Sequence, residues 1–392
     1  MKVNYRIALI GGGKRGISLA RHFAKDPNRA KLVAVAEPRQ DRQAECTQEL
    51  GLPAASIYQD HSELLARCTD LDAVIVATDP PTHREVAGAS MDRQLAVFLE
   101  KPMADTIENA KAIADKAVQT QATVQVGFNM RYAPFYEKLY EIVAGGELGT
   151  VLSVNWTEAP SMRMWIDDYC RSPSYNRRAA IGSWILEKSC HDIDQFNWLI
   201  GTRCVRVSSF GSRSYFVPRS DLPMHCTEGC PVTDCLYRSH KQEARVRLQP
   251  EESDICVYNC DSDLLDRQTT ILEYENGTVV NFNLLPVDGG RYMHIAGTEA
   301  TLYGSDAQEQ ITVHSMRTGD EITYHPRAPR DGHGGADVRM PTAFFDYLDD
   351  RSQMPKTTPK EGLEAVIMCC AADIAAQEHR VVELDSLRAG AG

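Results

Sequence analysis

Two short segments of the chain carry side chains suited to acid–base chemistry. In Glu100-Lys101-Pro102, a lysine ammonium can stabilise a developing oxyanion, and the Lys101–Pro102 bond can be cis. In the run from Glu187 to Asp194, Glu187 lies one helical turn before His191 and Lys188 lies three residues before it. A histidine beside a carboxylate exchanges a proton near neutral pH, as oxidation of a secondary alcohol requires. The candidate catalytic residues are therefore Lys101, His191, Glu187 and Lys188, with Lys188 and Asp194 also expected to contact substrate.

A glycine-rich segment near the N-terminus, Gly11-Gly12-Gly13-Lys14-Arg15-Gly16, matches the spacing G-x-G-x-x-G. It follows an apolar run and opens a helical pattern, which is the context in which such glycines bind a pyrophosphate. The free N–H groups at the start of the helix then hold the anion. We expect this turn to bind a dinucleotide through Gly11, Gly13, Lys14, Arg15 and Gly16.

An acidic residue, Glu37, ends the second apolar run, 21 residues after Gly16. A carboxylate at this position accepts hydrogen bonds from the ribose hydroxyls and repels a 2′-phosphate, so it favours NAD over NADP. Arg39, two residues later, suits a 2′-phosphate and keeps NADP open as the alternative. Both residues are predicted to lie at the cofactor.

The positions of these residues follow from alternating strand and helix patterns over the first 128 residues. Such alternation predicts βαβ units and a parallel sheet, here a dinucleotide-binding domain of residues 1–128. Glu100 and Lys101 directly follow the fourth strand, Ala96 to Leu99. Ligands of open α/β sheets bind at the carboxyl ends of the strands, so Lys101 is expected to face the cofactor.

The pattern changes after Gly149 to alternating strands with few helices. We expect residues 129–392 to form an α+β domain with a mostly antiparallel sheet, and Glu275-Asn276-Gly277 to turn a hairpin. Asp254 to Cys260 is one of the expected strands, and Ile181 to Leu199 is the expected helix of the His191 segment. The fold class is thus α/β, with a dinucleotide-binding domain built on a parallel sheet followed by an α+β domain with a mostly antiparallel sheet.

The charge of the whole chain limits its partners. The 392 residues include 42 basic and 54 acidic side chains, for a net charge of −12. An acidic chain without a basic tract is a poor ligand for nucleic acids or anionic membranes, and no apolar run is long enough to span a bilayer. We therefore expect a cytoplasmic protein that binds neither nucleic acid nor membrane.

A cluster of arginines stands out against this acidic background. The stretch before the histidine segment contains Arg163, Arg171, Arg177 and Arg178 among Trp165, Tyr169 and Tyr175. Guanidinium groups suit sulfonates, carboxylates and phosphates, so one hypothesis is an anionic sugar bound by Arg163, Tyr175, Arg177 and Arg178. The alternative is that these arginines form salt bridges between subunits.

Twelve cysteines are unusual for a reducing compartment, where disulfides are rare. Three of them, Cys226, Cys230 and Cys235, lie within an insertion of about residues 224–239. Crowded thiolates in a loop hold Zn²⁺ readily, so a structural zinc is one hypothesis, with Cys256, Cys260, His225 or His240 as fourth ligand. Reduced cysteines without a metal are the alternative.

Taken together, several segments resemble the glucose–fructose oxidoreductase/inositol dehydrogenase/MocA family. They are the glycine turn, Ala77 to His83, Glu100 to Pro102, Val126 to Tyr132, Glu187 to Asp194, Asp331 to Asp337 and Pro359 to Ala365. The resemblance implies a Rossmann domain, NAD(P)-dependent oxidation or reduction of a sugar or cyclitol hydroxyl, and a sheet that forms a homodimer or homotetramer.

Roles for individual residues also follow from the resemblance. Lys101 would be the lysine of the family's Glu-Lys-Pro motif, and His191 its catalytic histidine. Residues Thr78, Pro80, His83, Asn129 and Arg131 would line the nicotinamide side, with Glu100 at the cofactor and Arg131 near substrate. Many family members have an aspartate four residues before the histidine, where this chain has Glu187.

Three functions remain open from the sequence. The first is a dehydrogenase that oxidises a sugar, glycoside or cyclitol hydroxyl and releases NADH. The second is a redox-neutral glycosidase that oxidises a sugar transiently, eliminates the aglycone, adds water and reduces the product. The third is a sensor that binds dinucleotide without catalysis.

Overall fold

The computed structural model describes residues 4–172, 175–238, 254–287, 289–329, 333–350 and 352–390. The chain divides into two units. One contains Met1–Lys138 and Arg327–Ile367 together with the last residues, Ala389–Gly392, and the other contains Leu139–Pro326 and Met368–Arg388. Among the described residues, no helix combines the length and the apolar character needed to cross a membrane.

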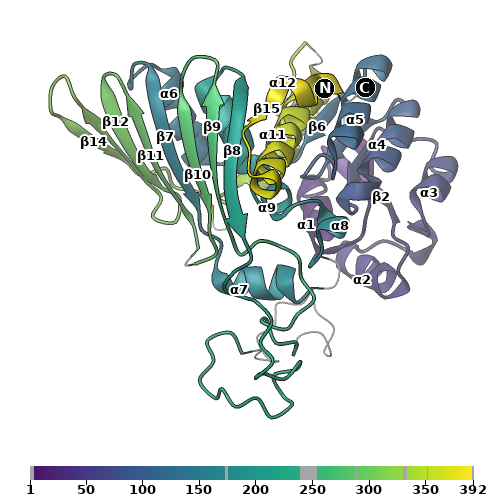
Figure 1. Cartoon of the computed structure of the whole chain (residues 1–392). Helices are drawn as coiled ribbons and strands as arrows, with labels where there is room; N and C mark the ends of the chain where they lie inside the picture. The colour runs from purple at the N-terminus through teal and green to yellow at the C-terminus, as the bar shows by residue number, and fades with distance from the viewer. Residues whose placement is uncertain are drawn as a thin grey trace. The chain divides into compact units, whose positions relative to one another are not determined.

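The sheet of the first unit has six parallel strands in the order β3-β2-β1-β4-β5-β6 (Figure 1). This order confirms the predicted Rossmann sheet, and it places the reversal of strand order between β1 and β4. The strands are β1 (Tyr5–Ile10), β2 (Ala30–Ala36), β3 (Ile57–Tyr58), β4 (Ala73–Val76), β5 (Ala96–Leu99) and β6 (Val124–Val126).

Helices follow the strands, as parallel connections require. They are α1 (Lys14–Phe23), α2 (Gln40–Leu50), α3 (His61–Arg67), α4 (His83–Asp92), α5 (Ile107–Thr120) and α6 (Pro134–Ala144). Two further helices come from the C-terminal part of the chain, α10 (Ala336–Asp349) and α11 (Pro359–Glu378). Helix α10 packs on α1 through aromatic side chains, because Phe344 lies 5.6 Å from Phe23 and 6.2 Å from Phe98, between ring centroids.

The second unit is built on a nine-stranded sheet in the order β14-β13-β12-β11-β7-β10-β9-β8-β15. Only the β7–β10 pair is parallel, so the predicted mostly antiparallel sheet is confirmed. The strands are β7 (Val151–Glu158), β8 (Cys204–Ser212), β9 (Arg267–Tyr274), β10 (Val279–Leu284), β11 (Arg291–Gly297), β12 (Ala300–Ser305), β13 (Gln310–Ser315), β14 (Glu321–Tyr324) and β15 (Val382–Glu383).

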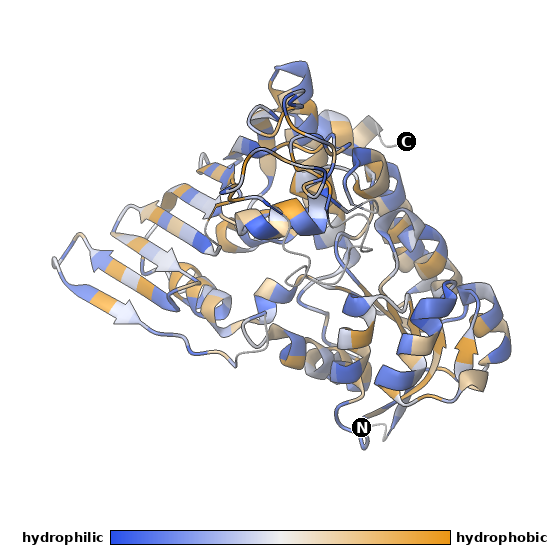
Figure 2. Ribbon diagram, turned by 90° about the horizontal axis from the view of Figure 1, so that it is seen from below, coloured by the Kyte–Doolittle hydropathy of each residue, from blue (hydrophilic) through white to orange (hydrophobic). Residues whose placement is uncertain are grey.

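Hydrophobic and hydrophilic residues alternate along these strands (Figure 2), as expected for a sheet with one face against a core. Helix α9 (Trp184–Ile200) covers the apolar face, where Phe196 packs edge-on against Trp156 and Phe282. This unit also contains four short helical segments: α7 (Met162–Met164), a π-helical turn (Trp165–Cys170), α8 (Arg178–Ile181) and most of α12 (Leu384–Gly390). The parts of α6 from Leu139 onward and of α11 from Met368 onward belong to it as well.

Two local predictions for the second unit have different outcomes. The hairpin at Glu275-Asn276-Gly277 is confirmed, because β9 and β10 pair antiparallel and Gly277 adopts φ +81°. The predicted strand from Asp254 to Cys260 is wrong. This segment forms turns inside the long β8–β9 connection, with a single bridge between His225 and Ile255.

We expect Phe344→Ala to destabilise the first unit by about 3–5 kcal/mol, because it leaves a cavity between α10 and the sheet. The residue is fully buried. The matched control Val118→Ala, at a side chain that is 78% exposed on α5, is expected to change stability by less than about 0.5 kcal/mol. Urea denaturation measures both, and equal midpoints for the two variants would contradict the packing described.

Candidate active site

The glycine turn joins β1 to α1 with the geometry that a pyrophosphate requires. Gly11 adopts φ +101°, and a Cβ there would lie 2.5 Å from the carbonyl oxygen of Ala77. Gly13 is the N-cap of α1, no side chain caps the helix, and a Cβ at Gly13 would meet nothing within 4 Å. The space beside Gly13 at the start of α1 is therefore open, so that a phosphate can approach this end of the helix.

Glu37 lies at the end of β2 with its carboxylate turned toward the glycine turn. Its Oε2 accepts a hydrogen bond from the Gly12 N–H at 2.9 Å, and its Oε1 accepts one from the Arg39 N–H at 3.0 Å. The Arg39 side chain also approaches this carboxylate, with Nε 3.5 Å from Oε1. The carboxylate is thus held in place, and its remaining lone pairs can accept hydrogen bonds from a ribose diol.

The Glu100-Lys101-Pro102 turn follows β5, and the Lys101–Pro102 bond is cis as the sequence analysis allowed. The Glu100 carboxylate folds back on its own turn, because its Oε2 accepts from the Lys101 N–H at 2.7 Å. Its Oε1 accepts from Nε of Arg15 at 2.7 Å. The backbone that carries Lys101 is therefore tied to the start of α1.

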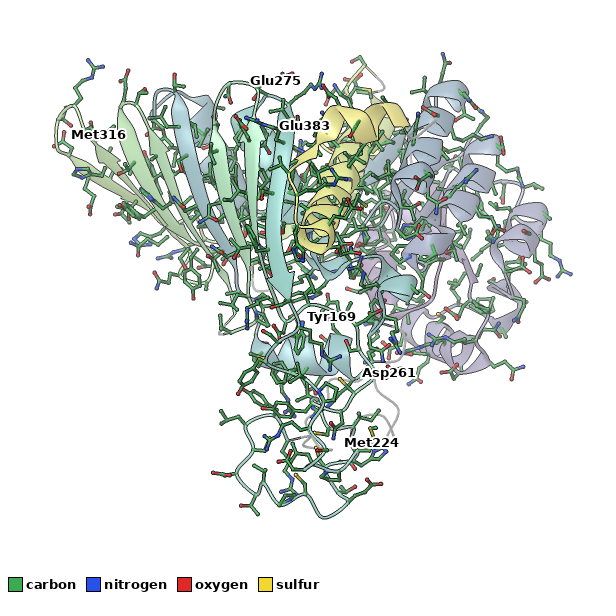
Figure 3. All side chains as sticks on the ribbon, viewed as in Figure 1. Tyr169, Met224, Asp261, Glu275, Met316 and Glu383 are labelled. Atoms are coloured by element: carbon green, nitrogen blue, oxygen red, sulfur yellow. The ribbon has the colours of Figure 1, made fainter. Side chains whose placement is uncertain are left out.

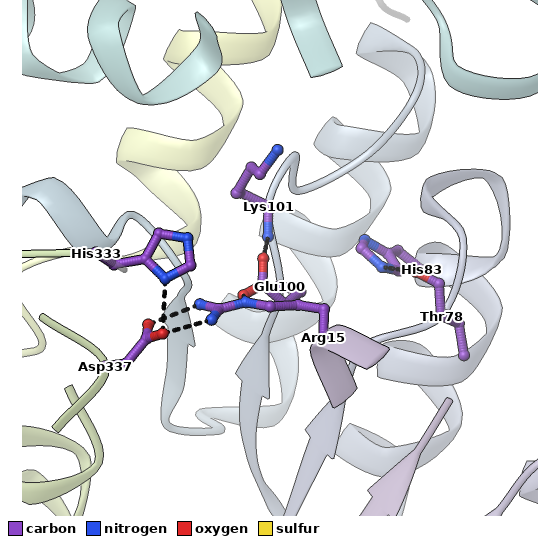
Figure 4. A network of polar contacts seen from close by, with 7 residues as sticks. All are labelled: Arg15, Thr78, His83, Glu100, Lys101, His333 and Asp337. Atoms are coloured by element: carbon purple, nitrogen blue, oxygen red, sulfur yellow. Dashed lines mark hydrogen bonds and ion pairs between the residues drawn. The ribbon is translucent and has the colours of Figure 1, made fainter. Parts of the chain in front are cut away.

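Arg15 joins the two parts of the first unit that lie far apart in sequence (Figure 4). Its NH1 and NH2 groups donate to the two oxygens of Asp337 at 2.8 and 3.0 Å. The sequence analysis assigned Arg15 to the cofactor. The structure instead places its guanidinium on the carboxylates of Glu100 and Asp337, so only the backbone of Arg15 remains in the anion-binding turn.

Asp337 carries a second partner, His333, whose Nδ1 lies 2.7 Å from Oδ2. Burial alone would raise the pKa of Asp337, but the hydrogen bonds from His333 and Arg15 outweigh it and hold the pKa well below its usual range. Asp337 is therefore a carboxylate at any physiological pH, flanked by a guanidinium and an imidazole.

His83, predicted to line the nicotinamide side, is fully buried. Its Nδ1 lies 3.1 Å from the carbonyl oxygen of Pro102, and its Nε2 lies 3.0 Å from that of Thr78. Burial lowers the pKa of this imidazole, against the hydrogen bonds to Thr78 and Met103. His83 thus links the loop after β4 to the loop after β5. Of Thr78 and His83, the half-buried Thr78 is the residue that a ligand can reach.

The remaining predicted residues of the first unit differ in accessibility. Pro80 and Asn129 are buried, and Lys14 is half-buried. Arg131 was expected to bind substrate, but it is buried and donates to the carbonyl oxygen of Lys356 at 2.8 Å. Arg131 therefore fixes the connection before α11.

In the second unit, the predicted catalytic segment forms the first half of α9, which Ser183 caps by accepting from the Leu186 N–H at 3.3 Å. Glu187 and His191 are one turn apart on this helix, as predicted, and both are mostly buried. Asp194 was expected to orient substrate, but it has no exposed surface. It belongs to the core beneath the helix rather than to a binding surface.

Lys188 belongs to a buried network of charges in the second unit. Its Nζ lies 3.1 Å from Oε1 of Glu158, and Arg291 Nε lies 2.7 Å from the other oxygen of Glu158. Arg291 also donates to Asp192 at 2.6 Å, and Trp156 donates to the same oxygen at 2.9 Å. Burial raises the pKa of Glu158, and the two cations oppose this shift. The network fixes the position of the Lys188 ammonium.

The arginine cluster is neutralised inside the second unit. Arg163 pairs with Asp167 at 2.8 Å, and the buried Arg171 pairs with the same residue at 2.7 Å. Arg177 pairs with Asp261, which is labelled in Figure 3, and Arg178 pairs with Asp373. Tyr175 packs edge-on against Tyr169. Each of these arginines thus has an acidic partner within the chain, and the anionic sugar stays a prediction.

The cysteine cluster does not form a metal site in the described part of the chain. Cys226, Cys230, Cys235 and Cys256 line one cavity in the β8–β9 connection, near Met224 in Figure 3, but no three potential ligands there come close enough to hold an ion. His240 lies outside the described residues. Cys260 has a different partner: the hydrogen bond with Cys170 lowers the pKa of Cys260 to about 7.

The sequence analysis assigned no role to Asp337, His333 or Glu158, which form the networks around Lys101 and Lys188. The first two were visible as residues i and i+4 in a segment that resembles the family, a spacing that brings side chains together on a helix. Glu158 gave no such signal, because its partners are distant along the chain. Arg291 lies opposite it on the paired strand β11, and Lys188 lies on α9.

Comparison with known proteins identifies the family and the fold of the chain. Residues 5–128 match the model described as "Oxidoreductase family, NAD-binding Rossmann fold", and residues 136–308 match the GFO/IDH/MocA C-terminal domain. The protein YteT of Bacillus subtilis is 25% identical over 329 residues, covering 73% of this chain and 75% of that protein. The scyllo-inositol 2-dehydrogenase (NAD(+)) of the same organism is 28% identical, over 54% of this chain and 58% of that enzyme.

A solved structure of levoglucosan dehydrogenase in complex with NADH and levoglucosan has the same fold. It superposes with a TM-score of 0.76 and 19% identity, covering 97% of this chain and 99% of that one.

We expect Glu37→Gln to weaken NAD binding by about tenfold and to narrow the preference for NAD over NADP, because a charged hydrogen-bond acceptor for the ribose diol is lost. Quenching or enhancement of nicotinamide fluorescence on titration with NADH and NADPH measures both affinities. Glu49→Gln, at an exposed position on α2, is the control. Unchanged affinities for both cofactors in Glu37→Gln would contradict this assignment.

Proposed function

Because the chain belongs to the glucose–fructose oxidoreductase/inositol dehydrogenase/MocA family, we propose that it oxidises a secondary hydroxyl of a sugar or cyclitol with NAD as hydride acceptor. The hydride passes from the carbon to the nicotinamide, and the hydroxyl proton passes to a base. The observation that carries this proposal is the Glu100-Lys101-Pro102 turn, held at the carboxyl end of β5 by Arg15.

In this reaction Lys101 stabilises the oxyanion that develops on the reacting oxygen, and His191 takes the hydroxyl proton. A lysine ammonium suits the first role because it is a compact charge that strengthens its hydrogen bond as the oxygen becomes negative. Glu187 lies one turn before His191 on α9, and Lys188 contacts a substrate oxygen. NAD, when bound, supplies the hydride acceptor.

The family match and the ordered carboxylate at Glu37 favour NAD as cofactor. Residues 129–392 then bind the substrate, and the open sheet of the second unit joins copies of the chain into a homodimer or homotetramer. A native mass measurement tests this assembly, and a monomer at micromolar concentration would contradict it.

We expect Lys101→Met to lower kcat/KM by about 10²–10³-fold, because one stabilising contact to the developing charge is removed. NADH affinity is expected to change less than threefold. Lys31→Met is the control, since Lys31 is exposed at the amino end of β2. NADH formation with myo-inositol, scyllo-inositol or levoglucosan measures the activity. A Lys101→Met variant with full turnover would contradict the role of Lys101, whereas a wild type that binds NADH but turns over none of these polyols would support a binding protein without catalysis.

A redox-neutral glycosidase would use the same hydride transfer with a different net reaction. It would release the leaving group of an aryl glycoside without added NAD and without net NADH formation. Steady accumulation of NADH with a polyol is the result that the dehydrogenase proposal predicts. Release of the aryl group in the absence of NADH formation would contradict it.

A further inference from the structure

A cavity of about 170 Å³ lies in the second unit, beside the long connection between β8 and β9. The connection extends beyond the end of the sheet, below α7 in the view of Figure 1. Four thiols line the cavity, but among the described residues no three potential ligands come close enough to hold a metal ion. The other side chains of its wall indicate what else can bind there.

Part of the wall is apolar and buried. Leu222 and Val257 are both buried, as are the thiols of Cys226 and Cys256. Thiols without a metal behave as small apolar groups. An apolar cavity of about 150 Å³ holds one benzene ring. A cavity of about 170 Å³ therefore accepts a single six-membered ring rather than a fused ring system.

Three tyrosine rings form the aromatic part of the wall. The hydroxyl group of Tyr237 donates to that of Tyr215 at 3.3 Å, and Tyr258 also hydrogen-bonds to Tyr215. Each pair of these rings has its centroids 6.2 Å apart. The buried Phe216 contacts all three rings and holds them in place. A planar ligand gains face and edge contacts from such a wall.

The charged side chains that line the cavity in the described part of the chain are all arginines, and no carboxylate lines it. They are Arg171, Arg219 and Arg238. Two of them already have acidic partners, since Arg171 donates to Asp167 at 2.7 Å and Arg219 pairs with Asp221. Such a wall favours an anion over a cation or a neutral molecule.

Arg238 is the guanidinium that an anion can reach. Its side chain is half-buried and makes no hydrogen bond or ion pair with any described residue. Its backbone is fixed, because its carbonyl oxygen accepts from Arg163 at 2.9 Å. A guanidinium binds a carboxylate through two parallel hydrogen bonds, which makes this pair specific as well as strong.

We propose that this cavity binds a small aromatic carboxylate with a single ring. The ring lies among the three tyrosines and the apolar wall, and the carboxylate accepts from the guanidinium of Arg238. A neutral ring lacks the second contact and an aliphatic acid lacks the first, so both bind more weakly. Binding here is independent of the oxidation proposed above, because none of the residues assigned to that reaction lines the cavity.

We use 4-fluorobenzoate as the probe and fluorine NMR titration as the measurement, with saturating NADH present so that the nicotinamide site is occupied. We expect the probe to bind about tenfold more tightly than 4-fluorobenzyl alcohol, because the alcohol makes no charge-assisted hydrogen bond. Arg238→Gln should weaken binding of the carboxylate by about tenfold and remove this difference. Arg317→Gln, at an arginine of the same unit that is 74% exposed, is the matched control.

A second variant tests the cavity itself. Val232 is half-buried in its wall, and Val232→Trp should fill the space and abolish binding of both compounds. The thiols give a readout that needs no variant. Cys230 and Cys235 are half-buried, so 4-fluorobenzoate should slow their alkylation by iodoacetamide severalfold. Cys68, a half-buried thiol of the first unit, is the internal control and should react at an unchanged rate.

The outcomes separate this site from the proposed function. Equal affinities for the two compounds, or a carboxylate affinity unchanged in Arg238→Gln, would overturn the site. Alkylation of Cys230 and Cys235 at the same rate with and without the probe would also overturn it. One zinc ion per purified chain, held by these thiols, would do the same, since a metal drawn between them closes the cavity. A wild type that binds 4-fluorobenzoate but forms no NADH with any polyol would overturn the proposed function alone.

Discussion

The ion pairs of Arg15 are the interaction on which the candidate site depends. One guanidinium joins Glu100, after β5, to Asp337, at the start of α10, and its own backbone belongs to the glycine turn. Removing one partner from such a buried pair leaves an uncompensated charge and costs about 3–5 kcal/mol. The same contacts therefore stabilise the unit and fix the positions of Lys101 and His333 relative to the cofactor-binding turn.

The second unit also holds charged side chains in place through ion pairs, around Lys188. Lys188 pairs with Glu158, and Arg291 pairs with Glu158, Asp192 and Asp306, so a lysine ammonium is held in a largely buried environment beside carboxylates. Lys101 is held differently, because its bond to Glu100 comes from the backbone N–H and not from the ammonium. An ammonium held in place, as that of Lys188 is, needs less reorganisation when a nearby oxygen becomes negative.

The sequence alone predicted features whose signal is local. The glycine turn, Glu37 at the end of β2, the cis bond before Pro102 and the placing of Glu187 and His191 on one helix all depend on neighbours within a few residues. The ion pairs of Arg177 and Arg178 escaped prediction because Asp261 and Asp373 are distant in sequence. The side-chain partner of Arg15 escaped prediction for the same reason, since Asp337 is more than 300 residues away in the sequence and reaches it only after the chain returns to the first unit.

Isotopic labelling tests directly whether a hydride passes from the substrate carbon to the nicotinamide. The enzyme would be incubated with NAD and with myo-inositol, or another oxidised polyol, that carries deuterium at the reacting carbon. We expect the deuterium to appear at C4 of the nicotinamide in the NADH formed, with a primary isotope effect on hydride transfer in a single turnover. Deuterium lost to water, or unlabelled NADH, would contradict it.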